Sequence, residues 1–199
     1  MTRPLCYGVA MQNLARAVAA AILAVALAVP ALAQDAPFEA TGEIRFLAYG
    51  ASSSGASWSA DRVVGPAVNM TRREDGGWAG DLLGRDLSLN LEGNRLTGSN
   101  VNLLISQKGS RIDVEGLFYN QRVRISLDGK KLQGRMGDCS YDFARTRGGT
   151  AYRGDVGCMR QGQRIPAAGK AGIELYGEAA SPNPPLPQLA LTLVAILPS

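Results

Sequence analysis

The chain has 199 residues, with 21 Lys and Arg, 17 Asp and Glu, three cysteines and no histidine. Without histidine, Ser-His-Asp catalysis, Cys-His catalysis and zinc binding through imidazole are all excluded. A hydrophobic fraction of 46% and a charged fraction of 19% are typical of a globular protein, and the length suits one domain.

The first predicted element is a secretory signal peptide over residues 1–33. An uncharged apolar run at 17–29 follows Arg16 and precedes Ala31-Leu32-Ala33, a small-residue cleavage site. The run is shorter than the roughly 20 residues of a membrane-spanning helix. Either Met1 or Met11 would serve as the start. We therefore expect export to the periplasm or the exterior of a bacterial-type cell, cleavage after Ala33, and no transmembrane span after cleavage.

The remaining residues, 34–199, are expected to form a single β domain. Within it, a three-residue pattern, an apolar residue followed by any residue and then glycine, occurs five times. Its glycines lie 18, 18, 18 and 20 residues apart, at Gly80, Gly98, Gly116, Gly134 and Gly154. A turn signal precedes each glycine, and apolar residues alternate between the turns, which is typical of half-buried strands. The register inferred from the turns places each glycine on the inward face, where it allows the backbone to bend. The pattern predicts an all-β fold, a curled antiparallel meander of about 8–10 strands that forms a barrel or a half-open clam.

The two cysteines left after cleavage fit this register. Around the turn at 148–149, Cys139 lies directly opposite Cys158, within disulfide distance, and an exported chain favours the bond. The same register places two further pairs opposite each other, namely Asp142 with Asp155, and Arg145 with Tyr152 as a cation–π pair.

The flanking segments are less regular. Alternating apolar and polar residues predict a first strand over 38–46 and another strand over 173–177. The small residues of 50–59 predict a flexible loop. A proline-rich spacer at 181–187 is expected to be extended. Residues 188–197 are apolar on both faces, so they form either a strand buried on both sides or a short helix that plugs one end of a barrel.

The carboxylates are the remaining candidates for acid–base or metal chemistry. Asp113 and Glu115 share the outward face of one strand, and a turn at 120–121 would place Glu115 diagonal to Arg124 in a surface ladder. Three further aspartates gather near the predicted disulfide: Asp138, Asp142 and Asp155. Residues 76–81 depart from the glycine-rich calcium repeat at Ala79. We expect no cofactor, and we favour solvated surface carboxylates over a metal site or a catalytic pair.

The distribution of charge indicates a partner. Residues 108–164 hold 12 basic and six acidic residues, a net charge of +6, whereas residues 34–107 hold six and nine, a net charge of −3. In the inferred register an outward face collects four arginines: Arg122, Arg124, Arg135 and Arg153. This face suits an anionic envelope component, a lipid or another protein. Nucleic acid is not expected, because the aromatic residues lie mostly on the opposite face; an ordinary solvated face stays the alternative.

The sequence therefore predicts an exported, non-catalytic envelope protein that acts by binding or by structural interaction. A carrier that holds an apolar ligand or lipid inside the barrel is the alternative, because inward apolar residues and glycines would line such a space. A histidine-independent carboxylate hydrolase is the third candidate. Whether the interior is open or filled separates the first two.

Overall fold

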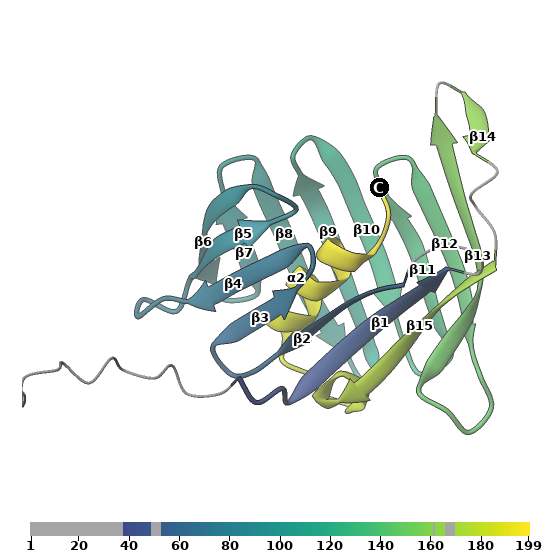
Figure 1. The fold of residues 1–199 in the computed structure, drawn as a ribbon, viewed down its shortest axis with the longest axis horizontal. Coiled ribbons are helices and arrows are strands. Elements are labelled where there is room, and N and C mark those ends of the chain that lie inside the picture. Colours follow the sequence, from purple (N-terminus) through teal and green to yellow (C-terminus); the bar gives the residue numbers. More distant parts are fainter. Residues whose placement is uncertain (1–37, 49–52, 161, 166–169) are drawn as a thin grey trace, which may run out of the picture. The chain divides into compact units, whose positions relative to one another are not determined.

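A computed structural model describes residues 38–48, 53–160, 162–165 and 170–199. The expected signal peptide and its cleavage site lie outside these residues. Residues 38–199 form one compact unit. In its described part, 14 strands close into an antiparallel barrel around one α-helix (Figure 1). The predicted all-β barrel is confirmed, and it is closed rather than half-open.

The strands follow one another around the barrel largely in chain order. Strands β1 to β12 form a continuous meander, β15 pairs with β1 and β13, and β13 pairs with β12 to complete the circle. A short strand, β14, pairs with β13 alone. The bounds are β1 Gly42–Ala48, β2 Ser54–Trp58, β3 Arg62–Gly65, β4 Val68–Arg72, β5 Trp78–Leu82, β6 Asp86–Glu92, β7 Arg95–Gly98, β8 Val101–Lys108, β9 Arg111–Phe118, β10 Gln121–Leu127, β11 Lys131–Met136, β12 Cys139–Arg145, β13 Ala151–Arg160, β14 Gln163–Ile165 and β15 Lys170–Gly177.

The barrel has more strands than the eight to ten expected from the sequence. Part of the difference lies in the segment 50–59, which was expected to be a loop: residues 54–58 of it form β2, paired with β1 and β3. Small residues permit this pairing, because the backbones approach closely. A Cβ atom on Gly65 would lie 2.6 Å from the carbonyl oxygen of Gly55. Residues 49–52 lie outside the described part.

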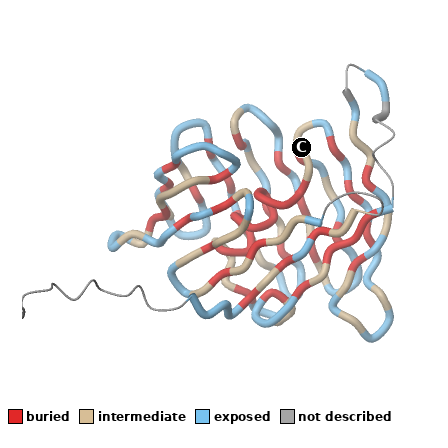
Figure 2. The backbone as a smooth tube through the Cα atoms, viewed as in Figure 1, coloured by how far each residue is buried: buried red, intermediate tan, exposed pale blue. Residues whose placement is uncertain are grey.

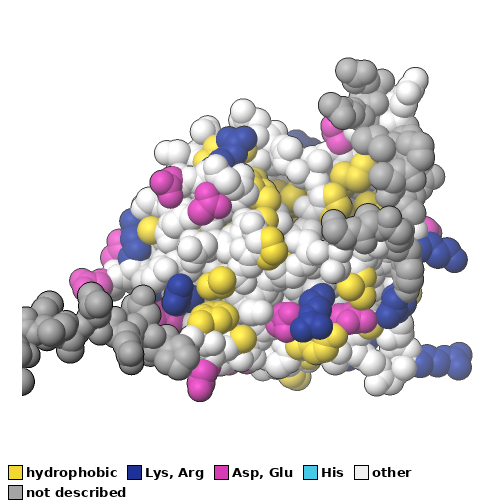
Figure 3. All heavy atoms as spheres, in the orientation of Figure 1, with side chains coloured by type: hydrophobic (Ala, Val, Ile, Leu, Met, Phe, Trp, Pro, Cys, Tyr) yellow, Lys and Arg dark blue, Asp and Glu magenta, His cyan; other side chains and the backbone are white. Residues whose placement is uncertain are grey.

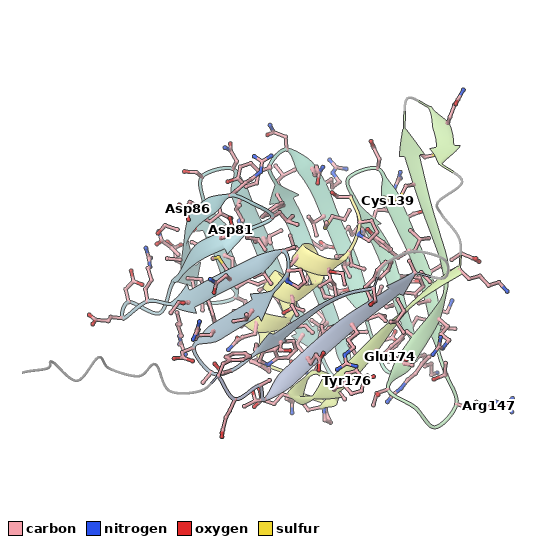
Figure 4. The ribbon with its side chains drawn as sticks, in the orientation of Figure 1. Asp81, Asp86, Cys139, Arg147, Glu174 and Tyr176 are labelled. Atoms are coloured by element: carbon pink, nitrogen blue, oxygen red, sulfur yellow. A yellow bond between two sulfur atoms is a disulfide. The ribbon has the colours of Figure 1, made fainter. Side chains whose placement is uncertain are left out.

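The inferred register is confirmed at several hairpins. Leu127 lies opposite Leu132, Ile125 opposite Gly134, and Ile105 opposite Val114. The bond between Cys139 and Cys158 is also present, across β12 and β13; Figure 4 labels Cys139 on β12. The sequence thus predicted which side chains point inward.

One turn differs from its prediction. The β9–β10 turn consists of Tyr119 and Asn120, not residues 120 and 121, and both have positive φ, at 48° and 65°. Such paired left-handed residues suit a two-residue hairpin turn. The Tyr119 ring packs edge-on against Phe118, with centroids 5.1 Å apart, and beneath the guanidinium of Arg85 at 4.0 Å. As a result, Glu115 lies directly opposite Arg124 rather than diagonal to it.

The recurring glycines bend alternate strands, from β5 to β13. Gly80, Gly116 and Gly134 have φ values of 137°, 149° and 150°, which residues other than glycine rarely adopt. A Cβ atom on Gly116 would lie only 1.9 Å from the carbonyl oxygen of Asn102 on the neighbouring strand. The glycines that recur about every 18 residues therefore lie where the curvature of the sheet leaves no room for a side chain.

The C-terminal segment forms a helix inside the barrel. Helix α2, Leu186–Ile196, follows a short 3-10 turn, η1, Glu178–Ala180. The helix packs against β1 to β4 and β8, and every residue from 188 to 196 is buried (Figure 2). Of the two conformations left open by the sequence for residues 188–197, the helix is correct. It begins at Leu186, so the last two residues of the segment 181–187, which was expected to be an extended spacer, are helical. No helix in the described residues has the length and apolar character that a bilayer span requires.

Candidate functional site

Three arginines project from the outer wall formed by β10 and β11. Arg122 and Arg124 alternate with inward Val123 and Ile125, and Arg135 lies directly opposite Arg124. All three are exposed; the Arg124 side chain is 77% accessible. We call these three residues the arginine face.

Among the described residues, only one of the three arginines of the arginine face is in an ion pair, although Asp113 and Asp142 line the same surface groove as Arg124. Arg124 pairs with Glu115, with Nε 3.2 Å from Oε1. Neither Arg122 nor Arg135 has an ion-pair partner among the described residues. Like charges directly opposite each other destabilise an antiparallel pair. An anion bound between Arg124 and Arg135 would therefore relieve a repulsion already present in the protein.

The fourth predicted arginine lies apart. Arg153 on β13 is opposite Ala144 of β12, whereas Arg135 is opposite Ser140, four residues away along β12. Its Nη2 lies 3.2 Å from the Glu174 carboxylate of β15. The register therefore does not bring Arg153 to the arginine face.

The predicted carboxylates occupy exposed or half-buried positions on the outer wall. Asp113 pairs with Arg111 at 2.9 Å, and Asp142 lies directly opposite Asp155, as the register predicted. In the part of the chain that the structure describes, no three acidic or cysteine side chains are grouped to hold a metal ion. Ion pairs also characterise the wall of β1 and β15, where Figure 3 shows basic and acidic side chains side by side.

A second concentration of charge lies at the end of the barrel where residues 178–185 connect β15 to α2, here called the linker end. Because consecutive turns alternate between the two ends, the β8–β9, β10–β11 and β12–β13 turns all meet there. These turns and the strand residues next to them carry six basic residues, called the basic rim: Lys108, Arg111, Lys130, Lys131, Arg145 and Arg147. Their one acid is Asp128. Figure 4 shows Arg147 at the tip of its turn, pointing away from the barrel.

The other turns at the linker end are balanced in charge. The stretches 59–62, 72–75 and 92–95 each carry as many acids as bases. Of the basic rim, Arg111 is paired with Asp113, and Arg145 donates to the carbonyl oxygens of Gly149 (2.9 Å) and Gly129 (3.3 Å). The remaining four cations have no ion-pair partner among the described residues. The positive charge is thus confined to one side of this end.

A cavity of about 250 Å³ opens between the basic rim and the linker. Its apolar lining comes from inward residues at the ends of strands and from η1, namely Ile112, Leu127, Leu175, Ala179 and Ala180. Its polar lining includes Ser110, Asp128, Arg145, Thr150 and Tyr152. The cavity is therefore apolar within and polar toward the rim.

The linker wall of this cavity is held at both ends. At one end, the Glu178 carboxylate accepts hydrogen bonds from Thr41 Oγ1 (2.7 Å) and Trp58 Nε1 (3.2 Å). At the other end, Gln107 Nε2 donates to the carbonyl oxygen of Pro182 (2.8 Å) and to Asn183 Oδ1 (3.0 Å). These bonds tie the linker to Thr41, to β2 and to β8, so the linker wall is fixed by contacts within the chain.

Two polar groups in the cavity wall are already engaged. The Tyr152 hydroxyl donates to the carbonyl oxygen of Asp128 (2.8 Å), and burial raises the pKa of this phenol, which keeps it neutral. The Asp128 carboxylate accepts from the amides of Lys130 (2.7 Å) and Lys131 (2.8 Å), and these bonds lower its pKa. The Arg145 guanidinium lies 6.0 Å from the Tyr152 ring, which agrees with the predicted pair.

The sequence reasoning did not identify the basic rim or the cavity. The basic rim could have been inferred, because alternate turns of an antiparallel meander, about 18 residues apart, lie at the same end of a barrel. Three such turns carry Lys and Arg residues. The cavity also depends on where η1 and the linker lie, and no local pattern indicates that.

The chain matches no protein-family model, and comparison with curated proteins and with solved structures gives no significant match.

Proposed function

We propose that this protein is an exported, non-catalytic binding protein of a bacterial-type cell envelope, and that it contacts an anionic envelope component through the arginine face. The observation that carries the proposal is the direct opposition of Arg124 and Arg135 on an exposed wall, with Arg122 two residues away. Among the described residues only Arg124 of these three is in an ion pair, and the guanidinium groups of Arg122 and Arg135 suit phosphate or carboxylate groups of a partner.

Export is supported by the leader pattern at residues 1–33 and by the disulfide. Disulfides persist in oxidising compartments and are rare in the cytosol. If the proposal is correct, the protein recovered from outside the cytoplasm begins at Gln34, which amino-terminal sequencing would measure. A protein that keeps its leader and stays in the cytoplasm would contradict this part.

The position of α2 favours surface binding over carriage inside the barrel. The helix occupies the interior between β1 to β4 and β8, which is space that an apolar ligand would need. For the carboxylate hydrolase, the favoured cluster was the group of aspartates near the disulfide, Asp138, Asp142 and Asp155, which are not grouped as a metal site among the described residues. The other pair, Asp113 and Glu115, is held by Arg111 and Arg124, an arrangement that suits a surface ladder better than acid–base chemistry.

Co-sedimentation with lipid vesicles tests the arginine face. We expect binding to vesicles rich in phosphatidylglycerol, little binding to phosphatidylcholine vesicles, and weaker binding as salt is raised, because exposed charges are screened. Arg122→Glu and Arg135→Glu should each reduce binding several-fold. Arg72→Glu, at the exposed end of β4 away from β10 and β11, is the matched control and should change vesicle binding little. Equal losses in all three variants, or binding that does not depend on salt, would refute the proposed face.

A further inference from the structure

We propose that the cavity at the linker end is a binding site for a small amphiphilic anion, with the apolar body inside and the anionic head at the basic rim. This inference is independent of the proposed function, because the cavity and the arginine face share no residue. The ligand would bind at the linker end of the barrel, because α2 fills the interior.

The volume of the cavity limits the size of the ligand's apolar part. An apolar cavity of about 150 Å³ holds benzene. By that proportion, the cavity of about 250 Å³ accommodates about ten non-hydrogen atoms. Its inner lining, Ile112, Leu127, Leu175 and Ala179, consists of residues that are at most 5% exposed. A body of this kind would cover apolar atoms that the helix leaves uncovered.

The charge of the rim sets the chemistry of the head group. Arg145 lines the cavity beside Gly129. Lys130, the next residue, lines an adjoining surface pocket that shares Gly129, Arg145 and Thr150 with the cavity. Two Arg145 nitrogens donate to carbonyl oxygens, which fixes the guanidinium plane, and Nη2 has no partner among the described residues. The one acid of the rim, Asp128, is turned to the amides of Lys130 and Lys131. A carboxylate or phosphate at the mouth therefore meets net positive charge.

The preformed walls favour binding. The linker is held by Glu178 at one end and Gln107 at the other, and Tyr152 is held by its bond to Asp128. A site whose walls are already ordered loses little conformational entropy when a ligand binds. The ligand class that fits is a monocarboxylate or monophosphate with a single ring or a medium-length alkyl chain.

Isothermal titration calorimetry of the purified chain with octanoate, kept below its micelle concentration, tests the site. We expect a single octanoate site, weaker binding of 1-octanol, and weaker octanoate binding at high salt. Ala180→Leu, which fills the cavity, should raise Kd about tenfold or more, which corresponds to about 1.4 kcal/mol. Lys130→Gln should raise Kd several-fold. The matched controls are Ala144→Leu on the outer wall of β12 and Arg72→Gln on β4, and both should bind octanoate as the unaltered protein does.

Several results would overturn the inference. They are no octanoate binding, equal affinity for octanoate and 1-octanol, and unchanged affinity in a folded Ala180→Leu protein. If Ala180→Leu does not fold, Thr150→Phe narrows the exposed mouth and should weaken binding in the same way. Arg135→Glu should leave octanoate binding unchanged, so the failure of this site and the failure of the arginine face are distinguishable.

Discussion

Gly134 illustrates how single residues shape the barrel. Its φ is 150°, and a Cβ atom would lie 2.0 Å from the carbonyl oxygen of Arg124 on the adjacent strand. Both the conformation and the close approach exclude a side chain. The glycine is therefore required by the curvature of the sheet and not by the turn that precedes it.

Gly134→Ala should destabilise the protein strongly, because the strained backbone and the clash with β10 act together. We expect the free energy of unfolding to fall by about 2–4 kcal/mol, measured by urea denaturation. Gly129→Ala is the matched control. Gly129 does not need positive φ, and the nearest atom to its added Cβ would be 3.9 Å away. Equal stability of the two variants would contradict this account of the repeated glycines.

Tyr141 links a buried phenol to the pH dependence of stability. Its side chain is buried, its hydroxyl donates to the carbonyl oxygen of Pro198, and burial raises its pKa above the ordinary value of 10. A raised pKa in the folded state means that the contribution to stability is complete below pH 10. It is lost as the pH rises above 10 toward the folded-state pKa.

Tyr141→Phe should therefore lose less stability than the unaltered protein between pH 9 and pH 11. Urea denaturation at a series of pH values measures the two slopes. At neutral pH the variant should be less stable by only about 1 kcal/mol, from the lost hydrogen bond. Identical slopes above pH 10 would show that Tyr141 does not control the alkaline loss.

At the scale of elements, the β12–β13 hairpin is closed by a covalent link at the end opposite its turn. Cys139 and Cys158 are 19 residues apart in the chain and directly opposite in the register. The same hairpin places Asp142 opposite Asp155, which is unfavourable. The disulfide therefore holds a hairpin that contains a local repulsion.

Replacing both cysteines by serine should lower the free energy of unfolding by about 3 kcal/mol, because a closed loop of this length restricts the unfolded chain. Denaturation with and without reductant measures the effect, and reduction should add the mass of two hydrogens to the unaltered protein. The double variant itself should be insensitive to reductant. No change in stability on reduction would mean that the bond does not restrict the unfolded state.

The elements differ in how far the sequence predicts them. Strands with alternating apolar residues and glycine-rich turns, such as β10 and β11, were predicted with their register. The β9–β10 turn was displaced by one residue, because the contact of the Tyr119 ring with Arg85, which lies on a distant part of the chain, is not a local signal. Strand β2 was missed because its small residues become a strand only through close pairing with β1 and β3.

At the scale of the whole molecule, the barrel is built around its own C-terminus. Helix α2 is buried on all sides, its Gln188 side chain donates to the carbonyl oxygens of Ser59 and Ala60, and the chain after it reaches Tyr141. The core that supports the strands therefore includes the last segment of the chain. We expect helix and barrel to unfold together.

Leu193→Ala should destabilise the entire barrel, because it opens a cavity at a position with no exposure. We expect a loss of about 2–5 kcal/mol. Tryptophan fluorescence, from Trp58 and Trp78 in the wall, and far-ultraviolet circular dichroism should report the same transition. Leu104→Ala is the control, because Leu104 is 42% exposed and should change stability by less than about 0.5 kcal/mol. Separate transitions for the two probes would refute a single cooperative unit.

The sequence by itself determined the all-β class, the inward and outward faces of most strands, the disulfide and the opposed pair Arg124 and Arg135. These follow from neighbours in one hairpin, and a period of two residues fixes which face each side chain takes. Only the tertiary structure decided the closure of the barrel, the helical state of residues 186–196, and the meeting of the basic rim with the linker. An apolar segment of about ten residues fits a strand and a buried helix equally well, and the space left inside the closed barrel decides between them. In the same way, turns distant in the sequence share one end only once the sheet has closed.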